Sequence, residues 1–338
     1  MNIIVIGSGV AGITFAEKMQ QLSDVNICVI TAENYGYYSR PMLSRGFSSE
    51  NIEKSIIIES FGALRDKNIQ LIENVAVTAI HCEQQYVVVQ VDDTSKQFSY
   101  DKLVIATGSA AFVPPPFVAY RDNFFLFNSL HDLKQLRKLR ESVLCSQQAF
   151  SWAIIGGGLI GCELASDMAV SGDKVCLLHA MDRLMERQLV VEDSSRLLDV
   201  MHGHGITVEF NQLVSTITPV NSQVSIESQD FQSEFDAVIV ACGFAPRIDM
   251  AEQAGLDTNR GILVNGHLQS SDPHIFALGD VAELPDNKLY PYILPIRSQA
   301  IWLAEFLAGQ HANSTWQVPD FSPKAKVHGF DAMHPFCF

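Results

Sequence analysis

The segment IIVIGSGVAGITFAEKMQQL, residues 3–22, joins a short apolar strand to a helix through a turn that contains Gly7, Gly9 and Gly12. In this Gly-x-Gly-x-x-Gly pattern, Gly7 permits the tight turn, Gly9 allows the backbone to approach a diphosphate, and Gly12 lets the helix pack closely on the sheet. Free N–H groups at the start of the helix attract the anion. The pattern therefore predicts a dinucleotide site, to which the intervening Ser8, Val10 and Ala11 also contribute.

The ribose contact of this first nucleotide has several candidates. The next strand, VNICVI at residues 25–30, ends at Thr31, in the place that a ribose-binding carboxylate usually occupies. The nearest acid is Glu33. The contact could come from the Thr31 hydroxyl, the Ala32 backbone or the Glu33 carboxylate, and Glu33 could equally be a solvated loop acid.

A second glycine turn lies in WAIIGGGLIGCELASDMAVSGDKVCLLH, residues 152–179. Gly156, Gly158 and Gly161 again stand between a strand and a helix, and Ile160 lies within the pattern. Two such turns predict two dinucleotides.

The second strand of this second fold ends at His179, where an acid would ordinarily bind the free ribose hydroxyl of NAD. His179 could also be an ordinary exposed loop residue. Asp182 and Arg183 follow closely and favour NAD and NADP respectively. We expect NADH rather than NADPH.

Two further segments predict the topology. YDKLVIATGSAAFVPPP, residues 100–116, is a strand followed by a turn at Thr107 and Gly108 and by a proline-rich stretch, which predicts a crossover out of the first domain. FDAVIVACGFAPR, residues 235–247, repeats this pattern at Gly243 and predicts the return.

The expected fold is therefore α/β, with two Rossmann-like, three-layer dinucleotide-binding domains, one inserted in the other. We predict four segments. They are a first part of the outer dinucleotide-binding domain at residues 1–112, an inserted dinucleotide-binding domain at 113–244, a second part of the outer domain at 245–320, and a C-terminal stub at 321–338.

Composition excludes several classes of protein. A formal net charge of −15 argues against a non-specific nucleic-acid binder. The basic run LKQLRKLRE, residues 133–141, is expected to be a solvated helix face, with an acidic protein partner as the alternative. The start MNIIVIG enters a strand directly and, with no apolar stretch long enough to span a bilayer, indicates a cytoplasmic protein. The seven cysteines include no close pair, so we expect neither a disulfide framework nor a metal site.

The segment GILVNGHLQSSDPHIFALGDVAE, residues 261–283, ends in a Gly279-Asp280 turn. Together with both glycine turns, it resembles the FAD-dependent pyridine nucleotide-disulfide oxidoreductases over residues 1–320. Within that family, YYSRPMLSRGF at residues 37–47 and GGGLIGCELA at 156–165 look most like rubredoxin reductases and NADH:flavorubredoxin reductases. The resemblance implies that the FAD-binding domain comprises residues 1–112 and 245–320, that 113–244 form the NAD(P)H-binding domain, and that 321–338 are the stub of a truncated C-terminal interface domain. It also implies that Asp280 binds the ribityl and phosphate part of FAD. Val77 and Ile293 are further candidate FAD contacts.

The same resemblance implies a group of residues around the flavin. Arg40 is expected to contact FAD, with Pro41 holding the turn, and Lys326 matches a lysine that approaches the flavin in relatives. Glu163 lies near the flavin ring in relatives, and Arg45 follows the motif where they have a lysine. We therefore predict an Arg45–Glu163 pair beside the flavin. The alternatives are a surface cation at Arg45 and a purely structural ion pair at Glu163.

Residues 33–81, where related disulfide reductases carry a redox cysteine, contain none. Cys162 and Cys176 are expected to be packing residues. The predicted enzyme therefore passes electrons from NADH through FAD directly to a small partner, which the resemblance suggests is a rubredoxin or flavorubredoxin. A ferredoxin reductase or diaphorase is the alternative enzyme.

The end of the chain supports a third alternative, a non-catalytic flavin-binding protein. FSPKAKVHGFDAMHPFCF, residues 321–338, is expected to begin a first strand of the C-terminal domain and then stop. About 40 further residues, a small sheet unit, would be expected in a complete relative.

Overall fold

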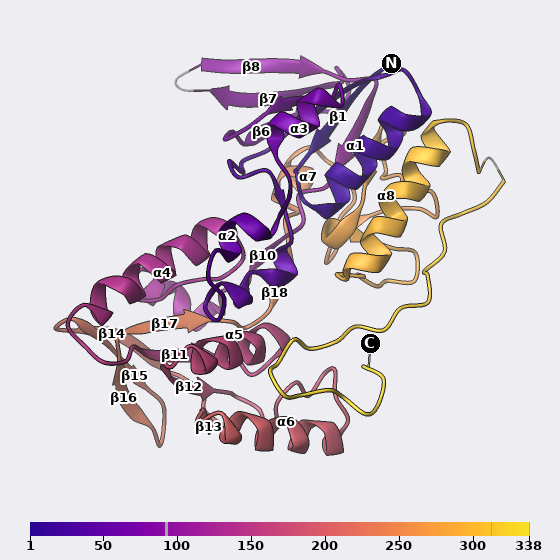
Figure 1. Cartoon of the computed structure of the whole chain (residues 1–338). Coiled ribbons are helices and arrows are strands. Elements are labelled where there is room, and N and C mark those ends of the chain that lie inside the picture. The colour runs from indigo at the N-terminus through magenta and orange to yellow at the C-terminus, as the bar shows by residue number, and fades with distance from the viewer. Residues whose placement is uncertain (92–93, 312, 338) are drawn as a thin grey trace. The chain divides into compact units, whose positions relative to one another are not determined.

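The computed structural model describes residues 1–91, 94–311 and 313–337, and its chain divides into two compact units (Figure 1). Unit 1 consists of Met1–Ser39, Ile57–Ala110 and Ala245–Phe321. Unit 2 consists of Arg40–Ile56, Ala111–Phe244 and Ser322–Phe338. Each unit has its own parallel sheet, so the expected α/β class with two Rossmann-like sheets is confirmed.

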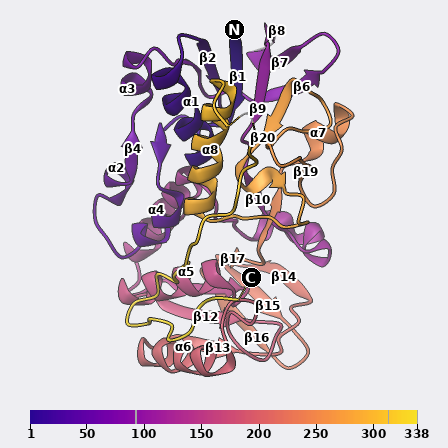
Figure 2. The same cartoon turned by 90° about the vertical axis from the view of Figure 1, so that its right-hand side faces the viewer.

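The centre of unit 1 is a five-stranded parallel sheet in the order β20-β9-β1-β2-β5. Its strands are β1 (Asn2–Ile6), β2 (Asn26–Ile30), β5 (Gln70–Ile72), β9 (Lys102–Ile105) and β20 (Ile275–Ala277). Residues Ile3 to Ile6 of β1 are all buried, as expected for a central strand covered on both faces. Helices α1 (Val10–Leu22) and α8 (Ile293–Leu307) lie side by side in this unit (Figures 1 and 2).

Smaller elements complete unit 1. An antiparallel sheet contains three strands, β6 (Val77–His81), β7 (Tyr86–Val91) and β8 (Thr94–Ser99). Two short pairs also form, β3 (Tyr37–Tyr38) with β4 (Ile57–Glu59) and β19 (Ile262–Leu263) with β21 (Ala282–Glu283). The remaining elements are α3 (Phe61–Asp66), α7 (Asp249–Gln253) and the 3-10 turn η4 (Gly279–Val281).

Unit 2 has a four-stranded parallel sheet in the order β13-β12-β11-β17. Its strands are β11 (Ser151–Ile155), β12 (Lys174–Leu178), β13 (Thr207–Glu209) and β17 (Ala237–Val240). An antiparallel sheet follows, formed by β14 (Thr216–Val220), β15 (Gln223–Glu227) and β16 (Gln232–Phe235). The helices are α2 (Ile52–Ser55), α4 (Leu130–Leu144), α5 (Leu159–Val170) and α6 (Val191–Gly203). The 3-10 turns are η1 (Arg40–Met42), η2 (Ser44–Gly46) and η3 (Pro115–Asn123). The strands β10 (Ser109–Ala111) and β18 (Phe244–Pro246) stand where the chain passes between units.

Two segments belong to unit 2 although the sequence analysis predicted other domains for them. Residues 40–56, within the predicted first FAD segment, pack with unit 2, as do residues 322–338. The expected first strand of a C-terminal domain is wrong, because no strand occurs in the described residues 321–337. This segment is instead held by hydrogen bonds to α5 and α6. The four predicted domain boundaries themselves remain a prediction.

The basic run lies on α4, which begins with a capping box between Ser129 and Asp132. Arg137 pairs with Glu53 at 3.3 Å and Arg140 with Asp173 at 2.6 Å, so these two cations are neutralised within unit 2. The expected solvated face is therefore only partly present. Among the described residues, no helix is long and apolar enough to cross a membrane.

Candidate cofactor-binding sites

The first glycine turn lies at the carboxyl edge of the unit 1 sheet and has the backbone geometry that the sequence predicts. Gly7 has φ +109°, and a Cβ there would lie 2.4 Å from the carbonyl oxygen of Ala106. A Cβ on Gly12 would lie 2.0 Å from the carbonyl oxygen of Gly7. Neither position tolerates a side chain, because the turn, strand β9 and helix α1 are packed against one another.

Gly9 is glycine for a different reason. It precedes α1 with extended backbone angles, and a Cβ built on it meets no protein atom within 4 Å. The space above Gly9 is therefore open, at the positive end of a helix of 13 residues. This open space beside the first turn of α1, formed by Val10 and Ala11, fits a diphosphate.

Two hydroxyls and a carboxylate lie at the end of β2. The buried Ser8 and Thr31 hydroxyls share a hydrogen bond of 2.8 Å, and Thr31 Oγ1 also accepts the N–H of Glu33 at 3.1 Å. Glu33 accepts the hydroxyl of Tyr38 at 2.9 Å, while Ala32 is exposed. Thr31 and Glu33 both have internal partners, but a carboxylate has more lone pairs than a hydroxyl and can accept further hydrogen bonds.

Asp280 comes to the same edge from the far end of the chain. A Cβ on Gly279, which has φ +81°, would lie 3.1 Å from the Ala11 Cβ, so this turn passes against the start of α1. The Gly279 N–H donates to Gln299 Oε1 at 2.8 Å, and Ser109 Oγ donates to Asp280 Oδ2 at 2.8 Å. A carboxylate beside the glycine turn can accept hydrogen bonds from cofactor hydroxyls.

The other expected FAD residues of unit 1 have simple positions. Gly108, with φ +66°, has open space where a Cβ would lie, and Thr107 Oγ1 donates to the Arg247 carbonyl at 3.4 Å. Val77 opens β6 and is partly buried. Ile293 opens α8 and is 41% exposed.

The second glycine turn repeats this geometry in unit 2. A Cβ on Gly156, with φ +119°, would lie 2.4 Å from the Ala241 carbonyl oxygen, and one on Gly161 would lie 1.9 Å from the Gly156 carbonyl oxygen. Gly158 precedes α5 and has open space, as does Gly243 after β17. Ile160 lies in the first turn of α5 and is partly buried. The unit 2 edge therefore fits a second diphosphate.

His179 is not an exposed loop residue, since only 8% of it is accessible. Its Nδ1 accepts the N–H of Gly157 at 3.0 Å, and its Nε2 lies 3.0 Å from Glu186 Oε2. Arg183 donates to the carbonyl oxygens of Glu186 and Leu189, both at 2.7 Å. Sequence reasoning missed Glu186, because nothing in its spacing links it to the end of β12.

The polar contacts of α5 correct the expected Arg45–Glu163 pair. Glu163, with a side chain only 2% exposed, binds Lys326 Nζ through both carboxylate oxygens at 2.6 Å and accepts the Lys326 N–H at 2.9 Å. Arg45 instead binds Asp167, at 3.0 Å. The expected partner of Arg45 was therefore wrong, although it lies on the correct helix. Glu163 and Asp167 are four residues apart on α5 and share one face, so the sequence did not distinguish them.

Asp167 is the centre of a second cluster on α5. Its Oδ1 accepts from Arg45, from Ser48 Oγ at 2.6 Å and from His328 Nε2 at 2.9 Å. Arg45 also contacts the His328 ring, and the His328 N–H donates to Ser166 Oγ at 2.9 Å. Sequence reasoning missed Asp167, although the four-residue spacing from Glu163 could have indicated it.

Arg40 and Pro41 form η1 in unit 2, where the Arg40 guanidinium donates to the backbone carbonyl of Asn128. The structure therefore gives Arg40 a protein partner. The contact with FAD stays a prediction.

Burial makes Cys162 and Cys176 poor candidates for redox chemistry. Burial raises the pKa of the Cys162 thiol far above its usual range, with the nearby Glu163 charge adding to the rise. Burial and then Glu209 raise the pKa of Cys176 to about 12. A thiol that stays protonated is a poor nucleophile. All seven cysteines are unpaired, and no cluster of ligands suited to a metal occurs in the part of the chain that the structure describes.

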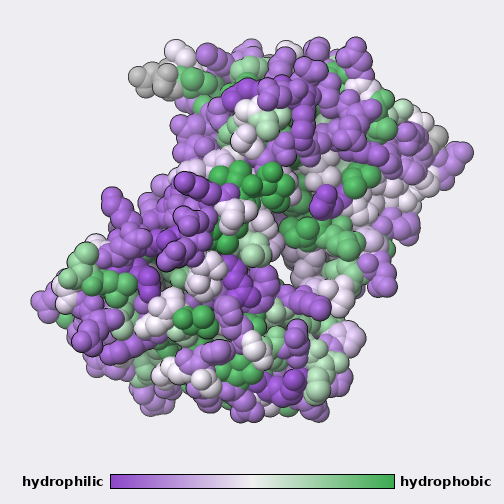
Figure 3. Space-filling view, in the orientation of Figure 1, coloured by the Kyte–Doolittle hydropathy of each residue, from purple (hydrophilic) through white to green (hydrophobic). Residues whose placement is uncertain are grey.

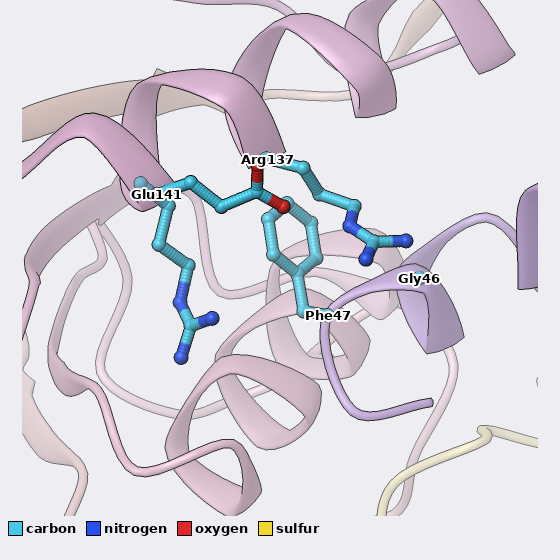
Figure 4. A pocket seen from close by; sticks show the side chains of 5 residues that line it. Gly46, Phe47, Arg137 and Glu141 are labelled. Carbon is cyan, nitrogen blue, oxygen red and sulfur yellow. The ribbon is translucent and has the colours of Figure 1, made fainter. Parts of the chain in front are cut away.

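Unit 2 also has pockets away from its glycine turn. Hydrophilic residues cover much of the face shown in Figure 3. A cavity of about 40 Å³ lies in unit 2 between η2 and α4, where Phe47 and Arg137 line it (Figure 4). It is too small for a nucleotide, and we assign it no role.

Comparison with known proteins identifies the family of this chain. The family described as "Pyridine nucleotide-disulphide oxidoreductase" matches residues 1–300. A "Nitric oxide reductase FlRd-NAD(+) reductase" of Vibrio vulnificus is 33% identical over 332 residues, covering 97% of this chain and 83% of the relative. A "Rubredoxin-NAD(+) reductase" of Alcanivorax borkumensis is 33% identical over 320 residues, covering 94% and 81%.

Among solved structures, the crystal structure of NADH:rubredoxin oxidoreductase from Clostridium acetobutylicum matches with a TM-score of 0.79 and 26% identity, covering 97% of this chain and 80% of the other. Fold and sequence thus lead to the same assignment, which confirms the resemblance seen in the motifs. The chain belongs to the pyridine nucleotide-disulphide oxidoreductase family.

Proposed function

We propose that this protein is an NADH-dependent FAD oxidoreductase that passes electrons to a rubredoxin or a flavorubredoxin. The observation that carries the proposal is the pair of glycine turns, each with open space above a helix N-terminus, in a chain 33% identical to reductases named for these partners. The buried, protonated thiols support direct transfer to a partner over transfer through a cysteine.

The residues at the edge of the unit 1 sheet fit FAD. The first turn of α1 and Gly9 would hold the diphosphate, Glu33 would accept a ribose hydroxyl, and Asp280 would accept from the ribityl chain. The further proposed contacts are Gly7, Ser8, Val10, Ala11, Gly12, Thr31, Ala32, Val77, Thr107, Gly108 and Ile293. Bound FAD supplies the chemistry, since it accepts a hydride and returns electrons one at a time.

The residues at the edge of the unit 2 sheet fit NADH. Gly158 and the first turn of α5 would hold its diphosphate, and Gly243 leaves open space at the end of β17. Gly156, Gly161, Ile160 and His179 complete the proposed set. The protein would thereby hold the nicotinamide in an orientation suited to hydride transfer.

Glu163 and Arg45 are proposed to act at the flavin, each through a different partner than the sequence predicted. The Lys326 ammonium orients Glu163, and Asp167 orients Arg45. Flavin contacts of Lys326, Arg40 and Pro41 belong to the same proposal. Stopped-flow reduction by NADH tests it with Glu163→Ala and Arg45→Ala. If both variants keep the wild-type rate and FAD content, neither residue has this role.

We also propose that the protein works in the cytoplasm. Its seven cysteines are unpaired, which is usual for proteins of reducing compartments. Cell fractionation checks this location, and recovery of the protein in an extracytoplasmic fraction would contradict it.

Anaerobic addition of NADH to the purified protein tests the function directly. The visible absorption of the flavin should be lost within seconds, and reduction of rubredoxin, flavorubredoxin and a ferredoxin should then be compared at equal concentrations. Absence of bleaching would refute an oxidoreductase. Faster reduction of ferredoxin than of the other two acceptors would refute the proposed partner.

A further inference from the structure

The loop after β12 carries a carboxylate that is held at the NADH edge of unit 2. The His179 ring lies directly beneath Gly157, where a Cβ would be 2.8 Å from the ring. Glu186 Oε2 lies 3.0 Å from His179 Nε2 on the other side of the ring. The imidazole therefore connects the glycine turn to Glu186.

The direction of these hydrogen bonds follows from the backbone. The Gly157 N–H can only donate, so His179 Nδ1 must be the acceptor in their 3.0 Å contact. A neutral imidazole then carries its proton on Nε2, which donates to Glu186 Oε2. A carboxylate has further lone pairs, so Glu186 can accept additional hydrogen bonds.

The loop that carries Glu186 is fixed by contacts of its own. The Met185 N–H donates to the Gly157 carbonyl at 2.9 Å, so the residue before Glu186 is tied to the glycine turn. The Arg183 guanidinium donates to the carbonyl oxygens of Glu186 and Leu189. The Arg183 guanidinium therefore stabilises the backbone of this loop through hydrogen bonds to its carbonyl oxygens.

We propose that Glu186, positioned by His179, accepts the adenosine ribose hydroxyls of NADH and thereby selects NADH over NADPH. In dinucleotide folds, the acid that does this ordinarily ends the second strand, and His179 stands in that place here. The His179 ring extends from that position to Glu186. The Glu186 carboxylate therefore supplies the negative charge, at a distance of one side chain from the usual place at the end of the strand. This inference rests on the proposed function, since it concerns the same NADH site.

Charge explains why NADPH would be disfavoured. A ribose 2′-phosphate placed within hydrogen-bonding distance of Glu186 would meet a like charge, which is costly in a partly buried site where the Glu186 side chain is 20% exposed. Arg187 is the neighbouring cation, 3.7 Å from Glu186 Oε1, but its side chain is 86% exposed. Solvent screens its charge, so it offsets little of the repulsion.

The test is direct binding of NADH and NADPH to the FAD-loaded protein, measured by titration under anaerobic conditions. Glu186→Gln keeps the shape of the side chain and removes its charge. Asp182→Asn is the comparison, because Asp182 is an exposed acid in the same loop and the competing candidate for favouring NAD. A third protein, His179→Asp combined with Glu186→Gln, places an acid at the end of β12 again.

Glu186→Gln should lower the ratio of NADH to NADPH affinity about tenfold, since a hydrogen bond to a charged group is lost and a like-charge contact is removed. Asp182→Asn should change this ratio less than about twofold, and the double variant should restore it. An unchanged ratio in Glu186→Gln, or an equal change in Asp182→Asn, overturns the role of Glu186 while NADH still bleaches the wild-type flavin. A wild-type protein that binds neither nucleotide overturns this inference and the proposed function together.

Discussion

The Glu163–Lys326 pair gives the most quantitative prediction, because it ties residues 322–337 to α5 with well-defined geometry. The perturbation is a double-mutant cycle with Glu163→Gln, Lys326→Met and both together. Each single change leaves one partner without its opposite charge. Lys326→Met is the more severe change, because the Glu163 side chain is only 2% exposed and would lose the ammonium that neutralises it. Of the hydrogen bonds between the two residues, only the one from the backbone N–H of residue 326 would remain.

The expected coupling free energy lies between the values for buried and surface pairs. Removing one member of a fully buried ion pair costs about 3 to 5 kcal/mol, and exposed pairs contribute about 0.2 to 1 kcal/mol. Lys326 is 28% exposed and binds both oxygens of Glu163 at 2.6 Å. We therefore expect a coupling free energy of about 2 kcal/mol.

The measurement is hydrogen exchange of the segment 322–330 in the FAD-loaded protein, because the Lys326 N–H itself donates to Glu163. The matched control is Arg65–Glu73, at 2.5 Å but with side chains 46% and 37% exposed, followed by exchange of its own segment, for which we expect about 0.5 kcal/mol. A coupling at Glu163–Lys326 no larger than that of the control would refute the reasoning.

Three further predictions concern the tail, the glycine turns and the thiols. Burial opposes ionisation of Asp193, but the N–H donors of residues 333–334 outweigh it and lower the pKa of Asp193 to about 2. The stabilisation of the segment 322–337 by Asp193 should therefore be complete above about pH 4 and lost as the pH falls toward 2. Asp193→Asn should abolish this pH dependence of hydrogen exchange in the segment. Gly9→Ala should fold normally, because a Cβ there meets no protein atom within 4 Å, but its affinity for FAD should fall at least about tenfold. Gly158→Ala should retain FAD and lose affinity for NADH. Titration with each cofactor measures both affinities. Cys162→Ala should leave the rate of flavin reduction in stopped-flow within about twofold of wild type, and a loss of about tenfold would show that the thiol takes part.

The glycine turns were predictable because their signal is local. Gly7 has the positive φ of the tight turn, and a Cβ on Gly12 would meet the Gly7 carbonyl oxygen within the same strand-turn-helix unit. The open space at Gly9 follows from the same pattern. The buried strands were predictable for a similar reason, since a run of apolar residues such as Ile3 to Ile6 has no stable place outside a core.

The ion pairs were not predictable in the same way. The sequence indicated that α5 carries an important acid and that the 37–47 segment carries an important cation. It did not indicate that Arg45 reaches Asp167, because Glu163 and Asp167 lie on one face and the choice depends on how η2 packs against α5. Glu163 binds Lys326 instead, which lies 163 residues further along the chain.

The fold class and the two glycine turns of this protein follow from residue spacing within single strand-turn-helix units, and the family follows from these turns together with the motifs at residues 37–47 and 261–283. Which charges meet depends on the tertiary structure, which also assigned residues 40–56 and 322–338 to unit 2. It also placed Glu186 beside His179, in a loop whose course no periodicity describes. The physical reason is that hydrogen bonds and ion pairs act over a few ångströms, so they depend on the folded path of segments far apart in the chain.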